Sequence, residues 1–153
     1  MLFRSIVASG KFKPVSAYLL SAFFLSQSLL SLHELVLYGD QLRYTVLGIS
    51  PNLFFIAGFG YAIDGPLLYL YANSLIRKDF RVGASHRLHI FPLAGYFVFL
   101  IFAYYIQEHL AKSQIIISYL FDKQWHFVTG DTLIKIIRLV YFLLALKIGR
   151  AHV

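Results

Sequence analysis

Long apolar runs alternate with short polar segments along this chain. Three of the runs cover about residues 14–37, 51–75 and 90–106. Their lengths fall within the roughly 17–25 residues that a helix needs to cross a bilayer core. Pro14, Pro51 and Pro92 each stand near the start of a run, where a proline removes no helical hydrogen bond. The pattern predicts three transmembrane helices.

A fourth run, residues 133–146, is shorter and contains Lys135 and Arg138. Residues 113–130 precede it, with an apolar cluster around residues 115–121 and Trp125 close behind. This cluster is too short to cross a bilayer, so we expect it to lie on the membrane surface. The predicted fold class is all-α: an integral membrane helical bundle of about four transmembrane helices plus a short interfacial helix.

The composition excludes a water-soluble domain. Hydrophobic residues make up 59% of the 153 residues and charged residues 14%, whereas a soluble domain carries about 25% charged residues. A disordered chain is excluded for the same reason, and the absence of cysteine excludes both a disulfide scaffold and a cysteine-ligated metal site. The lipid bilayer is therefore the expected partner, and a homodimer stays open.

The net charge of +7 comes from basic residues that lie mostly between the apolar runs. This distribution is typical of charges that orient membrane spans, and it differs from a nucleic-acid-binding stripe. Basic residues precede the first run and fill the loop of residues 77–87, namely Arg4, Lys11, Lys13, Arg77, Lys78, Arg81 and Arg87. We therefore predict a multi-pass protein of the inner (cytoplasmic) membrane with the loop from Arg77 to Arg87 in the cytoplasm.

The last six residues, 148–153, read IGRAHV and match the codon-by-codon translation of a common sequencing-adapter run. An ordinary basic tail after a membrane span is the alternative. We expect residues 1–147 to form a partial transmembrane, sensor-like domain, and residues 148–153 to be adapter read-through. The chain would then be a fragment of a longer protein.

One series of short motifs is distinctive: GPLLYLY at residues 65–71, then Asp79-Phe80-Arg81, then HRLHIFP at residues 86–92. Over about residues 14–106 the chain resembles the N-terminal membrane domain of bacterial membrane-bound AraC-type transcription regulators. The resemblance implies a signal-sensing membrane domain followed by a cytoplasmic helix-turn-helix domain. That second domain is absent from this sequence, so DNA would be bound only through the missing part of the parent, and the ligand sensed is unknown.

Ionisable residues within the runs are the candidate sensing residues, since a charge inside a membrane is costly unless it is paired or hydrated. Asp64 lies near the middle of the second run and is expected to point into the bundle, with either a sensing or a structural role. Glu34 and Lys135 are each about one helical turn inside the outer end of their runs. They could pair with each other or extend to the membrane surface. Arg138 completes this set.

Small residues in the second run form a predicted packing surface. Gly58, Ala62 and Gly65 are spaced i, i+4 and i+7, so in one continuous helix they would share a face that another helix can approach closely. Pro66 removes a helical hydrogen bond, and we expect Gly65-Pro66 to bend the helix.

The sequence offers no catalytic constellation, no cofactor-binding motif and no metal site. His86 and His89 are three residues apart, but two histidines without a third ligand favour an interfacial role. We therefore predict that the chain is not an enzyme. The principal alternative to a sensor domain is a small complete multi-span protein such as a transporter component; a membrane enzyme using Asp64 and a histidine ranks below it.

Overall fold

A computed structural model describes residues 14–77 and 80–150, and within these ranges the chain is helical, with no β-strand. Arg4, Lys11, Lys13 and Lys78, which carry part of the orientation argument, lie outside the described residues, as do the last three residues of the chain. The α-helices are α2 (Pro14–Tyr38), α3 (Asp40–Ile49), α4 (Gly60–Ile76), α5 (Phe91–Leu100), α6 (His109–Ile117) and α7 (Trp125–Arg150). Short 3₁₀ segments connect them at Pro51–Leu53, Ile56–Phe59, Ala84–Ile90 and Leu120–Asp122, and α5 continues into a π-helical turn, Ile101–Tyr105.

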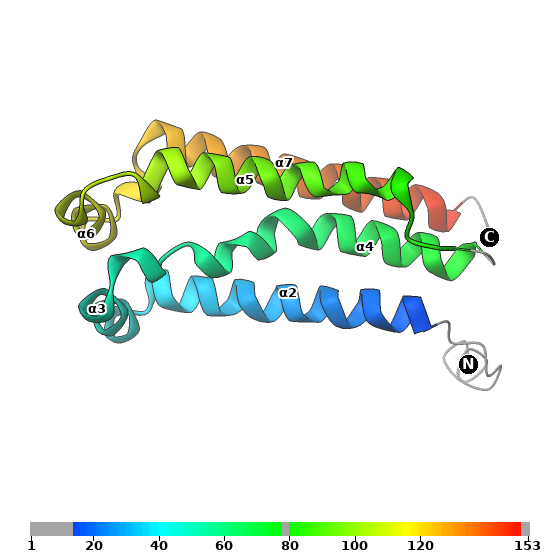
Figure 1. Cartoon of the computed structure of the whole chain (residues 1–153), viewed down its shortest axis with the longest axis horizontal. Helices are drawn as coiled ribbons and strands as arrows, with labels where there is room; N and C mark the ends of the chain where they lie inside the picture. The colour runs from blue at the N-terminus through cyan, green and yellow to red at the C-terminus, as the bar shows by residue number, and fades with distance from the viewer. Residues whose placement is uncertain (1–13, 78–79, 151–153) are drawn as a thin grey trace.

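The long helices α2, α4, α5 and α7 lie lengthwise beside one another, and α4 packs against both α2 and α7 (Figure 1). The short helices α3 and α6 lie across one end of this bundle. The opposite end holds the start of α2, the end of α7 and the connection from α4 to α5. The two ends therefore differ in construction.

Three segments are long and apolar enough to cross a membrane: Pro14–Tyr38, Pro51–Ile76 and His86–Tyr105. The first three predicted runs are confirmed as helical segments of this kind. The fourth, α7, has 26 residues but carries five charged side chains, so its length suits a membrane span and its charge does not. The charged side chains of α7 are Asp131, Lys135, Arg138, Lys147 and Arg150.

The end bearing α3 and α6 contains the largest apolar core. Phe54, Tyr104 and Ile116 are at most 1% exposed there, and the ring of Phe55 stacks against the ring of Phe127 with centroids 5.8 Å apart. The Tyr104 hydroxyl donates to the Pro51 carbonyl at 2.6 Å, which satisfies a buried polar atom in the core. We call this region the capped end.

The segment predicted to lie on the membrane surface contributes to this core. Ile115 and Ile116 of the predicted surface segment are buried in the core, with 6% and 0% exposure, because apolar composition does not distinguish a protein-facing residue from a lipid-facing one. The Trp125 side chain is 78% exposed and begins the long helix α7. Residues 40–49, which lie between the first two predicted spans, form helix α3.

The predicted single helix of the second run is broken near its start. Phe55 adopts a left-handed backbone conformation (φ 65°), and α4 begins only at Gly60. Gly58 therefore lies in the 3₁₀ segment Ile56–Phe59 and does not share a helix face with Ala62 and Gly65. Pro66 lies inside α4, which continues to Ile76.

Candidate functional site

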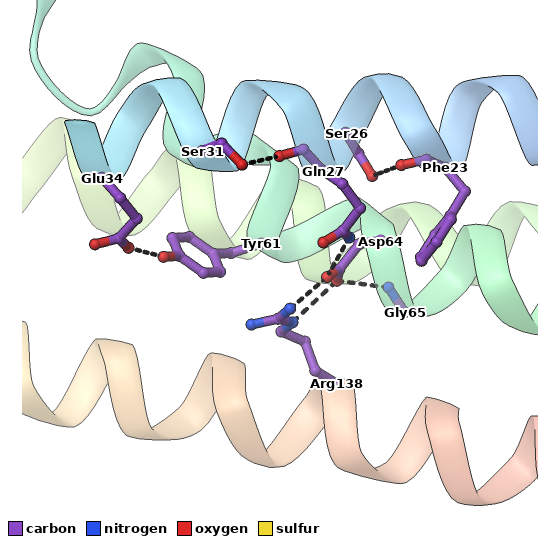
Figure 2. A network of polar contacts seen from close by, with 9 residues as sticks. All are labelled: Phe23, Ser26, Gln27, Ser31, Glu34, Tyr61, Asp64, Gly65 and Arg138. Carbon is purple, nitrogen blue, oxygen red and sulfur yellow. Dashed lines mark hydrogen bonds and ion pairs between the residues drawn. The ribbon is translucent and has the colours of Figure 1, made fainter. Parts of the chain in front are cut away.

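Asp64 is buried in the middle of the bundle, as expected, with 4% of its surface exposed. It projects from α4 toward the space between α2 and α7, where it contacts side chains from both helices (Figure 2). Its Oδ1 also accepts a hydrogen bond of 2.6 Å from the backbone N–H of Gly65. A carboxylate at this depth requires such partners, because an unpaired charge in a low-dielectric interior is costly.

Arg138 of α7 forms a two-pronged ion pair with Asp64. The Arg138 Nη2 lies 2.6 Å from Asp64 Oδ2, and its Nε donates to Asp64 Oδ1 at 3.2 Å. Two parallel charge-assisted hydrogen bonds fix both the distance and the orientation of the groups they join. The guanidinium also lies 5.1 Å from the ring centroid of Tyr61, within the range of a cation–π contact.

The network reaches α2 at two points, one through Asp64 and one through Tyr61. Gln27 donates to Asp64 Oδ2 at 3.2 Å, and the Tyr61 hydroxyl donates to Glu34 Oε1. Figure 2 shows these groups in the space between α2 and α7, over α4. Three helices that are distant in sequence are thus connected by polar side chains, of which we call Gln27, Asp64 and Arg138 the central network.

Of the two alternatives for Glu34 and Lys135, a pair between them is not among the ion pairs of the described residues. Lys135 instead pairs with Asp131 one turn earlier on α7, with 2.6 Å between Nζ and Oδ2, and its side chain is 63% exposed. Glu34 is held by Tyr61. Of the four residues predicted as polar sensing candidates, the structure joins Asp64 directly to Arg138 and places Glu34 and Lys135 around a neighbouring cavity.

Tyr141 is a second meeting point on α7, one turn beyond Arg138. A Cβ atom at Gly65 would lie 3.0 Å from the Tyr141 Cβ, so glycine allows α4 and α7 to approach closely there. The Tyr141 hydroxyl shares a hydrogen bond of 2.9 Å with His89 Nδ1, and its ring packs edge-on against Tyr69. Residues of both distinctive motifs, GPLLYLY and HRLHIFP, therefore converge on one side chain of α7.

The predicted small-residue surface serves two different neighbours. Ala62, 1% exposed, and Gly65 are buried within α4, and Gly65 faces α7. Gly58 instead lies beneath His33 and the Tyr96 hydroxyl. Gly60, which the spacing argument did not select, brings α4 against α2, because a Cβ there would lie 2.8 Å from the Ser26 carbonyl oxygen.

Metal binding receives no geometric support from the two histidines. The rings of His86 and His89 lie 6.2 Å apart; His86 Nδ1 accepts from the Gly83 N–H, and His89 bonds Tyr141. Across residues 14–77 and 80–150, no group of three or more histidine or carboxylate side chains is placed to hold a metal ion.

Several residues of the site were not predicted from the sequence. Gln27, Tyr61 and Tyr141 are uncharged at neutral pH. Their presence in or near apolar runs therefore gave no sign of a buried polar contact. Arg43 lies between the predicted spans, yet it is 3% exposed, bonds Asp40 at 2.7 Å and lies 4.2 Å from the centroid of the Tyr119 ring. Amphipathic spacing in residues 40–49 was the signal that could have revealed it.

Comparison of the chain with protein-family models, with curated proteins and with solved structures finds no match in any of the three. The interpretation of function therefore depends on the motifs and on the geometry of the site.

Proposed function

We propose that this chain is the membrane-embedded, signal-receiving part of a bacterial AraC-type transcription regulator. It has four spans, α7 being the fourth, in the cytoplasmic membrane, and it acts on a helix-turn-helix domain that follows α7 in the parent protein. Three segments apolar enough to cross a bilayer support the membrane location. The motif series in α4 and in Ala84–Ile90 supports the family.

The charges of α7 are compatible with a fourth span. Arg138, the most central of them, is paired with the buried Asp64. Lys135 and Asp131 neutralise each other closer to the capped end, and Lys147 and Arg150 lie in the last turn, where a cation is favourable. An intramembrane charge that is paired in this way adds a specific contact between spans.

The distribution of basic residues supports an orientation with the capped end outside. Arg77, Arg81, Arg87, Lys147 and Arg150 all belong to the end opposite α3 and α6. Cytoplasmic segments carry the excess of lysine and arginine. The C-terminal end of α7 would then lie in the cytoplasm, where a DNA-binding domain must be.

The observation that carries the proposal is the convergence of the motif residues on α7. Asp64 and Gly65 hold this helix near its middle, and His89 holds it through Tyr141. A change in the central network would therefore move or release the helix that leads to the proposed cytoplasmic domain. A local change at one contact that alters a connected output element is how signal-dependent switches work in general.

Sequencing the parent gene beyond the codon for Lys147 tests the proposed function. We expect an open frame that continues into two helix-turn-helix units. A stop codon shortly after Lys147 would refute the proposal and favour a small complete multi-span protein, such as a transporter component.

The orientation can be tested by cysteine labelling. The sequence contains no cysteine, so an introduced cysteine is the only one in the chain that can react. We expect a single cysteine at the exposed Ala84 to resist an impermeant thiol reagent in intact cells, and one at the exposed Ser118 of the capped end to react. Both cysteines should react once the cells are permeabilised. Labelling of Ala84→Cys but not Ser118→Cys in intact cells would reverse the topology.

A further inference from the structure

A cavity of about 260 Å³ lies beside the central network, toward the capped end. Residues of α2, α4, α5 and α7 line it, together with the turn that contains Phe121 and Asp122. Glu34, at the edge of the network in Figure 2, belongs to its wall. Known pockets for drug-sized ligands measure roughly 300–1,000 Å³, so this cavity suits a smaller molecule.

The lining of the cavity is electronegative. Three carboxylates, of Glu34, Asp122 and Asp131, face it, whereas Lys135 is the cation in the lining. Each carboxylate has one recorded partner: the hydroxyls of Tyr61 and Tyr38 for Glu34 and Asp122, and Lys135 for Asp131. One cation cannot balance three carboxylates, so positive charge from a ligand would be favourable there.

His33 adds a polar side chain to the wall of the cavity. Its side chain lines the cavity and is only 6% exposed. Its ring contacts the rings of Phe55 and Tyr61, at 5.7 and 5.9 Å between centroids, but its nitrogens have no hydrogen-bond partner among residues 14–77 and 80–150. The imidazole nitrogens are not among the fully enclosed, unpartnered atoms of the described residues, so they are open to a donor or acceptor in the cavity.

The remaining walls are largely aromatic, including Phe55, Tyr96, Phe99 and Phe127. Aromatic faces attract organic cations and also bury an apolar body. A bare metal ion fits poorly, because no metal-holding group of three ligands is present in the described ranges. A phospholipid headgroup would bring its phosphate beside three carboxylates, which is unfavourable.

We propose that this cavity binds a small free organic amine in its protonated form, with the ammonium between Glu34 and Asp131 and the apolar part against the aromatic wall. The inference goes beyond the proposed function, because the cavity belongs to the bundle whether or not a DNA-binding domain follows it. It identifies a ligand class where the motifs identify none.

Binding of 2-phenylethylamine to the purified chain in phosphatidylcholine nanodiscs, followed by calorimetry, tests the proposal. Phenethyl alcohol, which has nearly the same shape and no charge, serves as the ligand control. We expect saturable binding of the amine and none of the alcohol. Absence of saturable amine binding up to about 10 mM, well above the Kd of a weak millimolar ligand, would overturn the proposal.

Two shape-preserving variants locate the site. Glu34→Gln and Asp131→Asn should each weaken amine binding by about tenfold, the loss expected for one hydrogen bond to a charged group. Glu108→Gln removes the same charge outside the cavity and should leave binding unchanged. Equal binding by all three variants, or equal binding of the alcohol, would show partition into apolar surface and refute the site.

A last arm distinguishes a free amine from a lipid. Replacing part of the phosphatidylcholine by phosphatidylethanolamine should leave the affinity for 2-phenylethylamine unchanged. Competition by this lipid would assign the ammonium to a headgroup and overturn the free-amine proposal.

Discussion

The capped end and the central network hold the same bundle together in different ways. At the capped end, the side chains of Tyr104 and Ile116 are fully buried among other apolar groups, so shape complementarity fixes the packing. In the central network, Asp64 is nearly as buried, but its stability depends on one cation from α7 and one amide from α2. Packing of the first kind has a single stable arrangement, whereas a buried ion pair is favourable only while both partners are present.

Under the proposed function, this difference makes the central network the expected point of control. Removing or displacing Arg138 changes the free energy of a buried charge, while the apolar core has no comparable single point of control. The cavity with Glu34 and Asp131 lies between the two regions. A ligand bound there would contact Tyr61, which in turn contacts Arg138.

The largest effect is expected from Arg138→Leu, which leaves Asp64 buried without its cation. We expect a loss of about 3–5 kcal/mol in the free energy of unfolding, the cost of removing one partner of a buried ion pair. Unfolding in mixed micelles with a rising fraction of denaturing detergent measures it. Adding Asp64→Leu should restore much of the stability, because no charge is then left unpaired. An Arg138→Leu variant as stable as the parent would show that the pair is not desolvated.

Ile116→Ala probes the capped end by the same measurement. Deleting this fully buried side chain should cost about 2–5 kcal/mol through lost burial and the cavity left behind. Adding Asp64→Leu should not restore the stability of Ile116→Ala, whereas it should restore much of that of Arg138→Leu. Ile117→Ala, on a neighbouring side chain that is 44% exposed, is the matched control and should cost clearly less. Equal losses for the two variants would contradict the buried position of Ile116.

The smallest effect is expected from Lys135→Ala. Both side chains of its ion pair with Asp131 are exposed, and the pair spans one turn of α7. The free energy of unfolding should therefore fall by about 0.3–0.5 kcal/mol. Comparing the stability losses of Lys135→Ala and Arg138→Leu distinguishes a charge that pairs only within α7 from one that attaches α7 to α4. A loss for Lys135→Ala as large as that for Arg138→Leu would remove the distinction.

The apolar pattern predicted the three most hydrophobic segments and the inward orientation of Asp64, because length and the cost of an intramembrane charge are local properties of the sequence. It did not predict that Arg138 would be the partner of Asp64. That pairing depends on the register between α4 and α7, and both helices begin away from the ends of their apolar runs, at Gly60 and Trp125.

The capped end was harder to predict for a different reason. The cluster of Ile115 and Ile116 has the composition expected of a membrane-surface segment, and only the tertiary fold shows that it belongs to the same buried core as Tyr104 and Phe121. The break before α4 arises from the left-handed conformation of Phe55, a residue type that gives no signal for it. Gly58 therefore lies before α4 and has neighbours different from those of Gly65.

The central claim is that Asp64 and Arg138 attach α7 to the rest of the bundle through their charges. A double-mutant cycle with Asp64→Asn, Arg138→Gln and the combined variant, measured as free energies of unfolding in one detergent mixture, tests it directly. We predict a coupling energy of about 1–3 kcal/mol, with the double variant more stable than the sum of the single losses implies. Additive losses would contradict the claim and reduce the pair to two independent polar side chains.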